Sequence, residues 1–301
     1  MKVLVTGGAG FIGSHLVDKL LTLGFEVVVV DNLSTGKKKN INPRAKFYKT
    51  DIRSDALDEV FTQETPDTVF HLAAQTNIMT SIKNPKEDYS INVEGTLNLL
   101  KSSQELRVKR FIFSSTVAVY GEPRYFPTDE RHPTNPINPY GENKLATEKY
   151  VESFAQKSEF EFTILRYANV YGPRQTRSSK AAVITIFLDK MKRGESVEIF
   201  GDGTQERDFV YVGDVVQATV SAMKKGSGEI LNIGTGNGVN INELFGLLCQ
   251  LCRYRKQPLY EDKRVEEIYK SIVNPERARE VLDWQAETTL KRGLELTTDG
   301  D

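Results

Sequence analysis

Apolar runs and amphipathic stretches alternate along the first half of the chain. Residues 2–6 and 26–30 are short and almost uniformly apolar, as in parallel strands that are covered on both faces. The stretch 11–24 between them has helical periodicity and stops at a glycine. The same alternation predicts further strands and helices, namely strands at 46–50, 68–74, 110–115 and 162–167, and helices from about 54, over 91–106 and from about 140. Repeated βαβ units predict an α/β protein with a doubly wound parallel sheet, which binds ligands at the carboxyl ends of its strands.

The regular alternation ends at about Arg166, and shorter mixed elements follow. We therefore predict two domains, in which residues 1–165 form the doubly wound unit and residues 166–301 form a smaller mixed α/β lobe. The segment near 208–232 is expected to pack back on the first domain. The sequence contains no internal repeat and no low-complexity linker between the two parts.

Composition and charge exclude several classes of partner. The 301 residues include 39% hydrophobic and 27% charged residues, which are ordinary values for a soluble globular protein. The formal net charge of −1 leaves no electrostatic footprint for nucleic acid or for a membrane surface. No apolar stretch approaches the length of a membrane span, and the N-terminus does not read as a signal peptide. We expect a cytoplasmic protein without a nucleic-acid or membrane partner.

The two cysteines, Cys249 and Cys252, form a C-x-x-C pattern, which raises the question of a metal or redox site. A zinc site needs a second pair of ligands, and the histidines are scattered far from this pattern in the sequence. The pair instead lies late in an apolar-periodic run at 241–252. We predict two core-facing cysteines and no metal site.

The first predicted strand leads into TGGAGFIG, in which Gly7, Gly10 and Gly13 are spaced three apart. Glycine allows a tight turn and the close approach of a pyrophosphate, which binds at the N-terminus of the following helix. The second strand ends at Asp31, whose carboxylate can accept both ribose hydroxyls of NAD and repels a 2′-phosphate. This pattern predicts a Rossmann-type site for NAD. An aspartate that only caps its own loop would give the same sequence, and the lysines at 37–39 leave NADP open.

A second candidate site is the pair Tyr140 and Lys144 in NPYGENK. Positions i and i+4 share one face of a helix, so the phenol and the ammonium can point into the same space. A free phenol has a pKa of about 10, and a nearby cation favours the phenolate. Lowering that pKa by roughly 3 takes about 4 kcal/mol, which requires a buried site and a second cation. From the spacing alone, an ordinary exposed pair remains the alternative.

Further motifs occur in order along the chain and carry a family resemblance. They are TGGAGFIG, DNLSTG, TDIR, HLAAQ, SSTVAVYGE, PYGENK, RYANVYGPRQ and GDGTQERDFVYVGDV. Together they resemble the extended short-chain dehydrogenases of the nucleotide-sugar epimerase/dehydratase group, over the chain from Met1 to about Trp284. The resemblance implies an isomerase that uses NAD as its cofactor and a UDP-sugar as its substrate. The expected reaction is 4-epimerisation of a UDP-hexose, either the UDP-glucose/UDP-galactose pair or its N-acetylated counterpart, through a transient 4-keto sugar.

The resemblance assigns catalytic roles to three residues that also contact the substrate or the cofactor. Tyr140 would take the proton from the sugar 4′-hydroxyl, and Lys144 would bind the nicotinamide ribose. Lys144 and the positive nicotinamide ring would together lower the pKa of Tyr140. Thr116, in STVAVYG, matches the family's serine or threonine that hydrogen-bonds the reacting oxygen.

The resemblance also implies a cofactor site along the strand ends. In addition to Tyr140 and Lys144, the residues expected to contact NAD are Gly7, Gly10, Phe11, Ile12, Gly13, Asp31, Asn32, Ser34, Thr35, Gly36, Asp51, Ile52, Leu72, Ala73, Ala74, Gln75, Asn92, Ser114 and Tyr167. Within this set, Asp51 and Ile52 match the pair that contacts the adenine. The four residues from Leu72 to Gln75 match a strand end that runs along the cofactor.

The second lobe is expected to bind the nucleotide sugar. Asn169 matches a family asparagine on the diphosphate side, and Arg207 matches an arginine that binds phosphate. Arg264 resembles the arginine of the family's R-x-G-D/E-x segment, in which Glu266 here replaces the usual glycine. Ser271 stands where glucose-specific members often carry a tyrosine, so we hypothesise tolerance of N-acetylated sugars. A serine that touches no ligand remains the alternative.

Other reactions use the same scaffold. Val117 and Ala118 occupy the positions of the acid pair that dehydratases carry after the catalytic threonine, which argues against dehydration. Epimerisation or decarboxylation of a UDP-uronate stays open, and a non-catalytic NAD-binding sensor is disfavoured because the tyrosine, lysine and threonine are all present. Family members usually pair two helices per subunit into a four-helix bundle, so the helices near 92–106 and 140–157 predict a homodimer.

Overall fold

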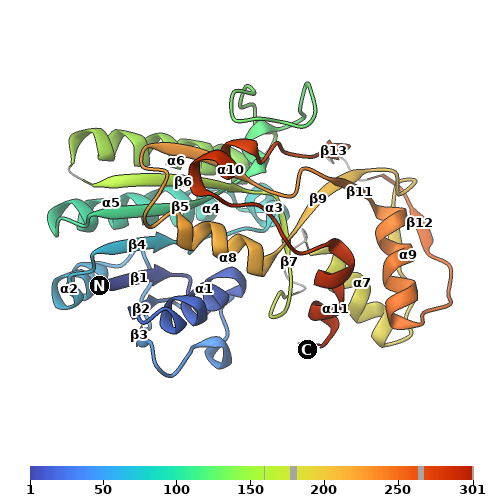
Figure 1. The fold of residues 1–301 in the computed structure, drawn as a ribbon, viewed down its shortest axis with the longest axis horizontal. Helices are drawn as coiled ribbons and strands as arrows, with labels where there is room; N and C mark the ends of the chain where they lie inside the picture. The colour runs from blue at the N-terminus through green and yellow to red at the C-terminus, as the bar shows by residue number, and fades with distance from the viewer. Residues whose placement is uncertain (159, 177–181, 264–267, 300–301) are drawn as a thin grey trace.

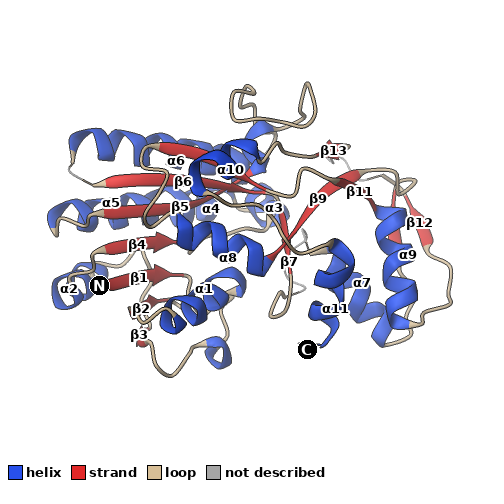
Figure 2. Cartoon of the chain, viewed as in Figure 1, coloured by secondary structure: helices blue, strands red, loops and turns tan. Residues whose placement is uncertain are grey.

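The computed structural model describes residues 1–158, 160–176, 182–263 and 268–299. Its largest element is a seven-stranded sheet in which all neighbouring strands are parallel. In spatial order the strands are β10 (Glu229–Ile233), β6 (Glu161–Tyr167), β5 (Arg110–Thr116), β4 (Thr68–His71), β1 (Lys2–Thr6), β2 (Glu26–Val30) and β3 (Lys46–Tyr48). Figures 1 and 2 show helices on both faces of this sheet, which confirms the predicted Rossmann-type doubly wound fold.

Two hydrophobic clusters, one on each face, explain why the central strands are uniformly apolar. Along β1, Val3 and Val5 belong to one cluster, whereas Leu4 between them belongs to the other. The first cluster takes its helical residues from α1 (Phe11–Thr22), α8 (Val212–Ser221) and α10 (Glu276–Leu282). The second takes them from α2 (Ala56–Glu64), α5 (Gly95–Glu105) and α6 (Pro139–Lys157). Because successive strand residues face opposite sides, both sides of each strand must be apolar.

The elements of a smaller unit lie beside the carboxyl ends of the large sheet (Figure 1). Its four-stranded sheet consists of β7 (Asn169–Tyr171), β9 (Glu206–Tyr211), β11 (Gly238–Asn240) and β13 (Lys270–Ser271). A two-stranded sheet is formed by β8 (Glu198–Phe200) and β12 (Leu259–Glu261). A third hydrophobic cluster includes residues of the helices α7 (Val183–Lys192), α9 (Ile241–Cys252) and α11 (Leu290–Asp299). Cys249 and Cys252 pack half-buried against this cluster, as the apolar run predicts, and both are free cysteines.

Several segments differ in detail from the predicted elements. The predicted strand at 68–74 ends at His71, because the next two backbone N–H groups donate to the side chain of Thr6. The helix predicted at 91–106 begins in a π-helical turn and continues as α5. That π-helical turn is η2 (Ser90–Glu94). Short helical elements that the pattern does not predict are η1 (Lys38–Asn40), α3 (Ile78–Lys83), α4 (Pro85–Tyr89) and η3 (Val117–Tyr120).

The chain crosses between the two units more than once. β7 follows β6 and joins the small sheet, and β9 lies in the same sheet. α8 then packs against α1, and β10 completes the large sheet beside β6. The division into domains at residues 165 and 166 therefore stays a prediction.

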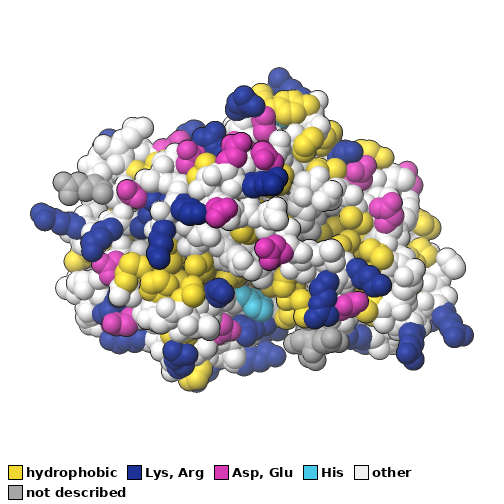
Figure 3. Space-filling view, in the orientation of Figure 1, with side chains coloured by type: hydrophobic (Ala, Val, Ile, Leu, Met, Phe, Trp, Pro, Cys, Tyr) yellow, Lys and Arg dark blue, Asp and Glu magenta, His cyan; other side chains and the backbone are white. Residues whose placement is uncertain are grey.

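Charged side chains of both signs are interspersed on the molecular face shown in Figure 3. Within the described ranges, no helix is long and apolar enough to cross a membrane. Over the same part of the chain, no group of three or more histidine, cysteine, aspartate or glutamate side chains could hold a metal ion.

Candidate active site

The glycine-rich loop packs so tightly that side chains would not fit. Gly7 has φ +70°, and a Cβ there would lie 2.7 Å from the backbone nitrogen of Ala73. A Cβ on Gly13 would lie 2.2 Å from the carbonyl oxygen of Gly7. Gly10 is the N-cap of α1, and no side chain caps this helix end. The first turn of α1, which includes Phe11 and Ile12, therefore presents backbone N–H groups that can bind an anion.

Asp31 follows the last residue of β2, lies beside this loop and is 8% exposed. Its Oδ2 accepts a 3.0 Å hydrogen bond from the backbone N–H of Ala9, and its Oδ1 accepts a 2.8 Å bond from Leu33 N–H. Burial raises the pKa of Asp31, and these two hydrogen bonds oppose that shift. Asp31 thus caps its own loop, and each carboxylate oxygen keeps a second lone pair for a ribose hydroxyl.

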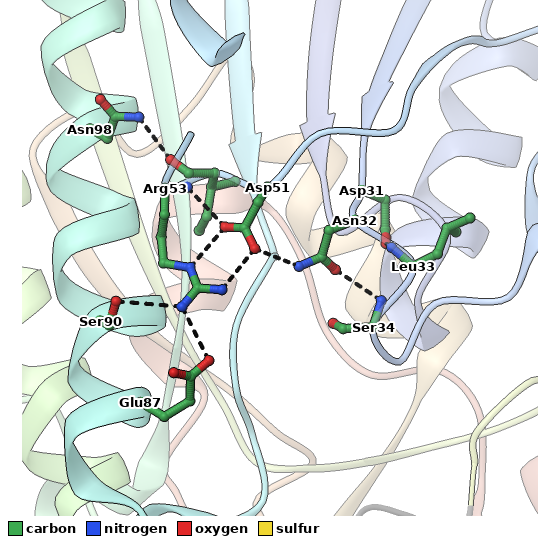
Figure 4. Close-up of polar contacts among 10 residues, drawn as sticks. Asp31, Asn32, Leu33, Ser34, Asp51, Arg53, Glu87, Ser90 and Asn98 are labelled. Atoms are coloured by element: carbon green, nitrogen blue, oxygen red, sulfur yellow. Dashed lines mark hydrogen bonds and ion pairs between the residues drawn. The ribbon is translucent and has the colours of Figure 1, made fainter. Parts of the chain in front are cut away.

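Asp51 and the loop after Asp31 form a connected polar group (Figure 4). Arg53 donates to both oxygens of Asp51 at 2.9 Å, and Asn32 Nδ2 donates to Oδ2 at 2.8 Å. The guanidinium of Arg53 holds the pKa of Asp51 well below its usual range. Ser34 N–H donates to Asn32 Oδ1 at 2.9 Å, which closes the loop before the exposed Thr35.

The residues around this group come from the loops after β2 and β3 and from the helices α4 and α5. Arg53 also donates to Glu87 Oε1 at 3.1 Å, so its guanidinium is held between two carboxylates. Ile52 is buried, and its carbonyl accepts a 2.9 Å hydrogen bond from Asn98 Nδ2. At Gly36, a Cβ would lie 2.8 Å from Asp31 Oδ1, so this position admits no side chain.

The strand end after His71 is held by the side chain of Thr6 in addition to a backbone hydrogen bond of 3.3 Å from Leu72 N–H to the carbonyl oxygen of Thr6. Thr6 Oγ1 accepts hydrogen bonds from the N–H groups of Leu72 and Ala73, so its own hydrogen is left for His71 Nδ1, 2.7 Å away. Ala74 and Gln75 follow. Asn92 clamps Gln75, because its Oδ1 accepts from Gln75 N–H and its Nδ2 donates to Gln75 O, both at 2.9 Å. The Asn92 amide therefore positions this strand end.

Tyr140 lies in the first turn of α6, the turn that the N-cap residue Asn138 fixes. Asn138 Oδ1 accepts a 3.0 Å hydrogen bond from Gly141 N–H, and Pro139 occupies a position where no N–H is needed. The Tyr140 phenol lies beside Thr116, which ends β5 and whose hydroxyl favours the ionised form of the phenol. The structure thus brings together a tyrosine and a threonine that are far apart in the sequence.

Lys144 is buried one turn later on the same helix. Its Nζ donates a 2.8 Å hydrogen bond to the carbonyl oxygen of Ser114 and lies 4.6 Å from the ring centroid of Phe113. Burial lowers the pKa of Lys144 to about 8, although the negative charges of Glu148 and Asp88 raise it. The exposed-pair alternative is wrong, because Lys144 is 3% exposed.

In the protein alone, the pKa of Tyr140 lies above the usual value of a phenol. Burial and the charge of Asp88 raise the pKa of Tyr140 to about 12, and only the hydroxyl of Thr116 opposes them. Lys144 alone therefore does not lower this pKa, in line with the energetic requirement for a second cation.

Three predicted substrate residues lie on the four-stranded sheet. Ser271 on β13 is directly opposite Arg207 on β9, and Asn169 on β7 pairs with the same strand at Phe209. Arg207 Nη1 donates to the carbonyl of Glu206 at 2.9 Å. The prediction for Arg264 falls outside the described residues.

One predicted cofactor residue turns its side chain away from the strand end. Tyr167 is buried in the first hydrophobic cluster, and its hydroxyl lies 2.8 Å from Thr219 Oγ1 on α8. Its main chain pairs with Thr116 at the end of β6. Sequence reasoning did not find Asp88, Asn143 or Glu148. Of these three, only Asn143 lies inside a motif that pointed to the site, PYGENK.

Comparisons with known proteins agree with this geometry. Residues 3–234 match the profile described as the NAD dependent epimerase/dehydratase family. A UDP-glucose 4-epimerase from Thermotoga maritima, solved with UDP-glucose, is 48% identical with a TM-score of 0.98, over 100% of this chain and 98% of that chain. The UDP-glucose 4-epimerase of Thermus thermophilus, solved with NAD, is 35% identical with a TM-score of 0.95, over 100% and 98% of the two chains.

A third solved structure differs in its named substrate. The UDP-N-acetylglucosamine 4-epimerase of Methanobrevibacter ruminantium M1, solved with UDP-N-acetylmuramic acid, is 33% identical with a TM-score of 0.95. The similarity covers 99% of this chain and 97% of that chain. The glycine loop, the Tyr-Lys helix and these similarities agree throughout, and the chain belongs to the NAD dependent epimerase/dehydratase family.

Proposed function

We propose that the protein is an isomerase that inverts C4′ of a UDP-hexose with NAD as its cofactor. The observation that carries this proposal is the contact of the Tyr140 phenol with Thr116, beside a buried Lys144 that is fixed at the end of the same strand. Proteins that share this fold over their full length are named UDP-glucose 4-epimerases.

The described residues fit a dinucleotide. Gly7 and Gly13 allow backbone approach where a Cβ would clash, and the uncapped N-terminus of α1 suits a pyrophosphate. Asp31 retains lone pairs for the adenosine ribose and places a negative charge where NADP carries a phosphate. When bound, NAD supplies the hydride acceptor and donor for C4′.

The proton steps fall to residues of α6 and β5. We assign proton transfer at the sugar 4′-oxygen to Tyr140 Oη, and a hydrogen bond to the same oxygen to Thr116 Oγ1. Thr116 Oγ1 accepts the N–H of Ala118 at 3.2 Å, which leaves its own hydrogen for the phenolate or for the sugar. Lys144, whose pKa is about 8, carries a positive charge at neutral pH that favours the phenolate.

The UDP group is proposed to bind against the four-stranded sheet, where Asn169, Arg207 and Ser271 lie on adjacent strands. An arginine suits a diphosphate, because its planar guanidinium can donate two parallel hydrogen bonds. We also propose a cytoplasmic homodimer, in which α5 and α6 of each subunit pair with those of the other.

Proton NMR of the purified protein tests the function. UDP-glucose, UDP-N-acetylglucosamine and UDP-glucuronate are each mixed with the protein, first without added cofactor and then with NAD⁺. Appearance of the galacto epimer of UDP-glucose is the expected result. Epimerisation or decarboxylation of UDP-glucuronate alone would replace the proposal by a uronate reaction. No conversion of any substrate with NAD⁺ present would refute catalysis on these sugars.

A further inference from the structure

Asp88 is a fully buried carboxylate on α4, with 0% of its surface exposed. Its Oδ2 accepts a 2.7 Å hydrogen bond from Asn143 Nδ2, and its Oδ1 accepts one from Gln75 Nε2. Among the described residues, these neutral amides are its side-chain partners, and no ion pair involves it. Burying a charge without a neighbouring cation costs desolvation free energy. The presence of a carboxylate at this position therefore needs a physical explanation.

The two partners of Asp88 belong to the two halves of the candidate site. Gln75 follows β4, and Asn92 clamps its backbone through two hydrogen bonds. Asn143 lies on α6 between Tyr140 and Lys144. A single carboxylate therefore ties the strand end along the cofactor to the helical turn that carries the catalytic pair.

The charge of Asp88 acts on both catalytic groups. It raises the pKa of Tyr140 and the pKa of Lys144, because a negative charge disfavours the phenolate and favours the ammonium. Removal of this charge lowers both values.

Other titratable and charged groups lie near this turn. Glu148 is paired with Arg166, which also donates to Tyr120, and its charge raises the pKa of Lys144 together with that of Asp88. His71 is buried, and burial together with the charge of Lys144 lowers its pKa well below the usual value, which keeps it neutral. The remaining charged residues on α3, α4, η2 and the first turn of α6 are exposed to water, namely Lys83, Lys86, Glu87, Glu94 and Glu142.

We propose that Asp88 is a positioning residue of the epimerase site, which fixes the turn of Tyr140 and Lys144 against Gln75 and adds a buried negative charge that acts on both Tyr140 and Lys144. This inference rests on the proposed function. Asp88 contacts neither sugar nor cofactor in this role, and it acts through Asn143 and through its charge.

The pH dependence of epimerisation in Asp88→Asn separates the charge from the contact. Asparagine has nearly the same shape, and a half-turn of the Asn143 amide keeps a hydrogen bond between the two side chains. The activity needs Tyr140 deprotonated and Lys144 protonated, so the two limbs of kcat against pH report the macroscopic pKa values of this coupled pair. We expect both limbs of Asp88→Asn to move toward lower pH by about 1. Limbs that coincide with those of the wild type overturn the charge role.

Asn143→Ala is the matched variant that keeps the charge and removes the contact. We expect its limbs to stay in place and its kcat to fall about tenfold or more, because the catalytic turn loses its anchor. An unchanged kcat overturns the positioning role. This arm also decides the proposal if Asp88→Asn does not fold, since an exclusively structural aspartate predicts a lower yield of Asn143→Ala with an unchanged kcat.

A spectroscopic titration does not need turnover. The ultraviolet absorbance of phenolate, measured in the NAD-bound protein and referenced to Tyr140→Phe, reports Tyr140 alone among the 12 tyrosines. A lower titration midpoint of Tyr140 in Asp88→Asn than in the wild type supports the inference, even if no UDP-sugar is converted. The same midpoint in both proteins contradicts it. The failure of the proposed function and the failure of this inference are therefore distinguishable.

Discussion

The Nζ atom of Lys144 lies 2.8 Å from the carbonyl oxygen of Ser114, so the cation on α6 is fixed to the strand that carries Thr116. The ammonium is 3% exposed, and burial lowers its pKa from the usual 10.5 to about 8. A lysine held in this way favours function at the expense of stability.

Replacing Lys144 with methionine is expected to stabilise the protein at pH 7. The folded pKa lies below the unfolded one, so the folded state binds fewer protons between about pH 8 and 10.5, and its stability rises with pH across that window. Below pH 8 the full penalty of about 3 kcal/mol applies. Loss of the bond to Ser114 offsets about 1 kcal/mol, so the free energy of unfolding should rise by about 2 kcal/mol.

Urea denaturation of cofactor-free protein at pH 7 and pH 10 measures this effect. The difference between Lys144→Met and wild type should shrink at the higher pH, and turnover should be lost. Lys149→Met serves as a control, because this exposed lysine on the same helix should change stability by less than about 1 kcal/mol. A destabilised Lys144→Met at pH 7 would contradict the burial argument.

Replacing Tyr140 with phenylalanine is expected to lower kcat by about a hundredfold or more while NAD stays bound. With a pKa of about 12, only about one phenol in a hundred thousand is ionised at pH 7 in the protein alone. A positive nicotinamide ring nearby lowers that pKa by roughly 1–3. By linkage, NAD⁺ should bind more tightly as pH rises, by about tenfold between about pH 8 and 10 for a shift of 3 and by about twofold for a shift of 2.

Calorimetric titration of NAD⁺ into cofactor-free protein tests this linkage. Tyr140→Phe should lose the part of the pH dependence that the phenol contributes. Tyr150→Phe, which alters a 38% exposed tyrosine on the same helix, should keep it. Identical pH dependence in Tyr140→Phe and wild type would show that this phenol does not sense the cofactor.

The sequence pattern anticipated the fold better than it anticipated the polar partners in the site. Uniform strands such as 26–30 report burial on two faces directly, since each residue has only two directions to point. Asp88 lies in a five-residue helix with no distinctive pattern, and its partners come from residues 13 and 55 positions away in the chain. The inward direction of Tyr167 depends on α8, which follows it much later. Such contacts are set by the folded geometry, which local periodicity does not encode.

Glu148 and Arg166 form a buried ion pair whose disruption should be strongly destabilising. Arg166 donates to Glu148 at 2.6 and 3.0 Å, and both side chains are almost fully buried. Glu148→Gln leaves the guanidinium without a counter-charge, which should lower the free energy of unfolding by about 3–5 kcal/mol. Chemical denaturation measures the loss, and Glu152→Gln, one turn further along α6, should lose less than about 1 kcal/mol. Equal losses in the free energy of unfolding for Glu148→Gln and Glu152→Gln would show that burial does not strengthen the Glu148–Arg166 ion pair.

Ser271 is expected to set the tolerance for a substituent on C2 of the sugar. It is half-buried on β13, opposite Arg207, to which we assign the diphosphate. A tyrosine in its place would fill the space beside C2, so Ser271→Tyr should lower kcat/KM for UDP-N-acetylglucosamine by about tenfold or more.

The smaller substrate provides the internal comparison for this substitution. UDP-glucose carries only a hydroxyl at C2, so the tyrosine would displace less of this sugar than of the N-acetylated one. A mismatch of one methylene group costs about 1–3 kcal/mol. The smaller displacement should keep the kcat/KM of Ser271→Tyr for UDP-glucose within about threefold of the wild-type value. Ser271→Ala should convert both sugars as the wild type does, since it removes the hydroxyl without adding volume. Parallel losses for the two substrates in Ser271→Tyr would mean that the tyrosine disturbs the β13–β9 pairing at Arg207, and the C2 assignment would then fail.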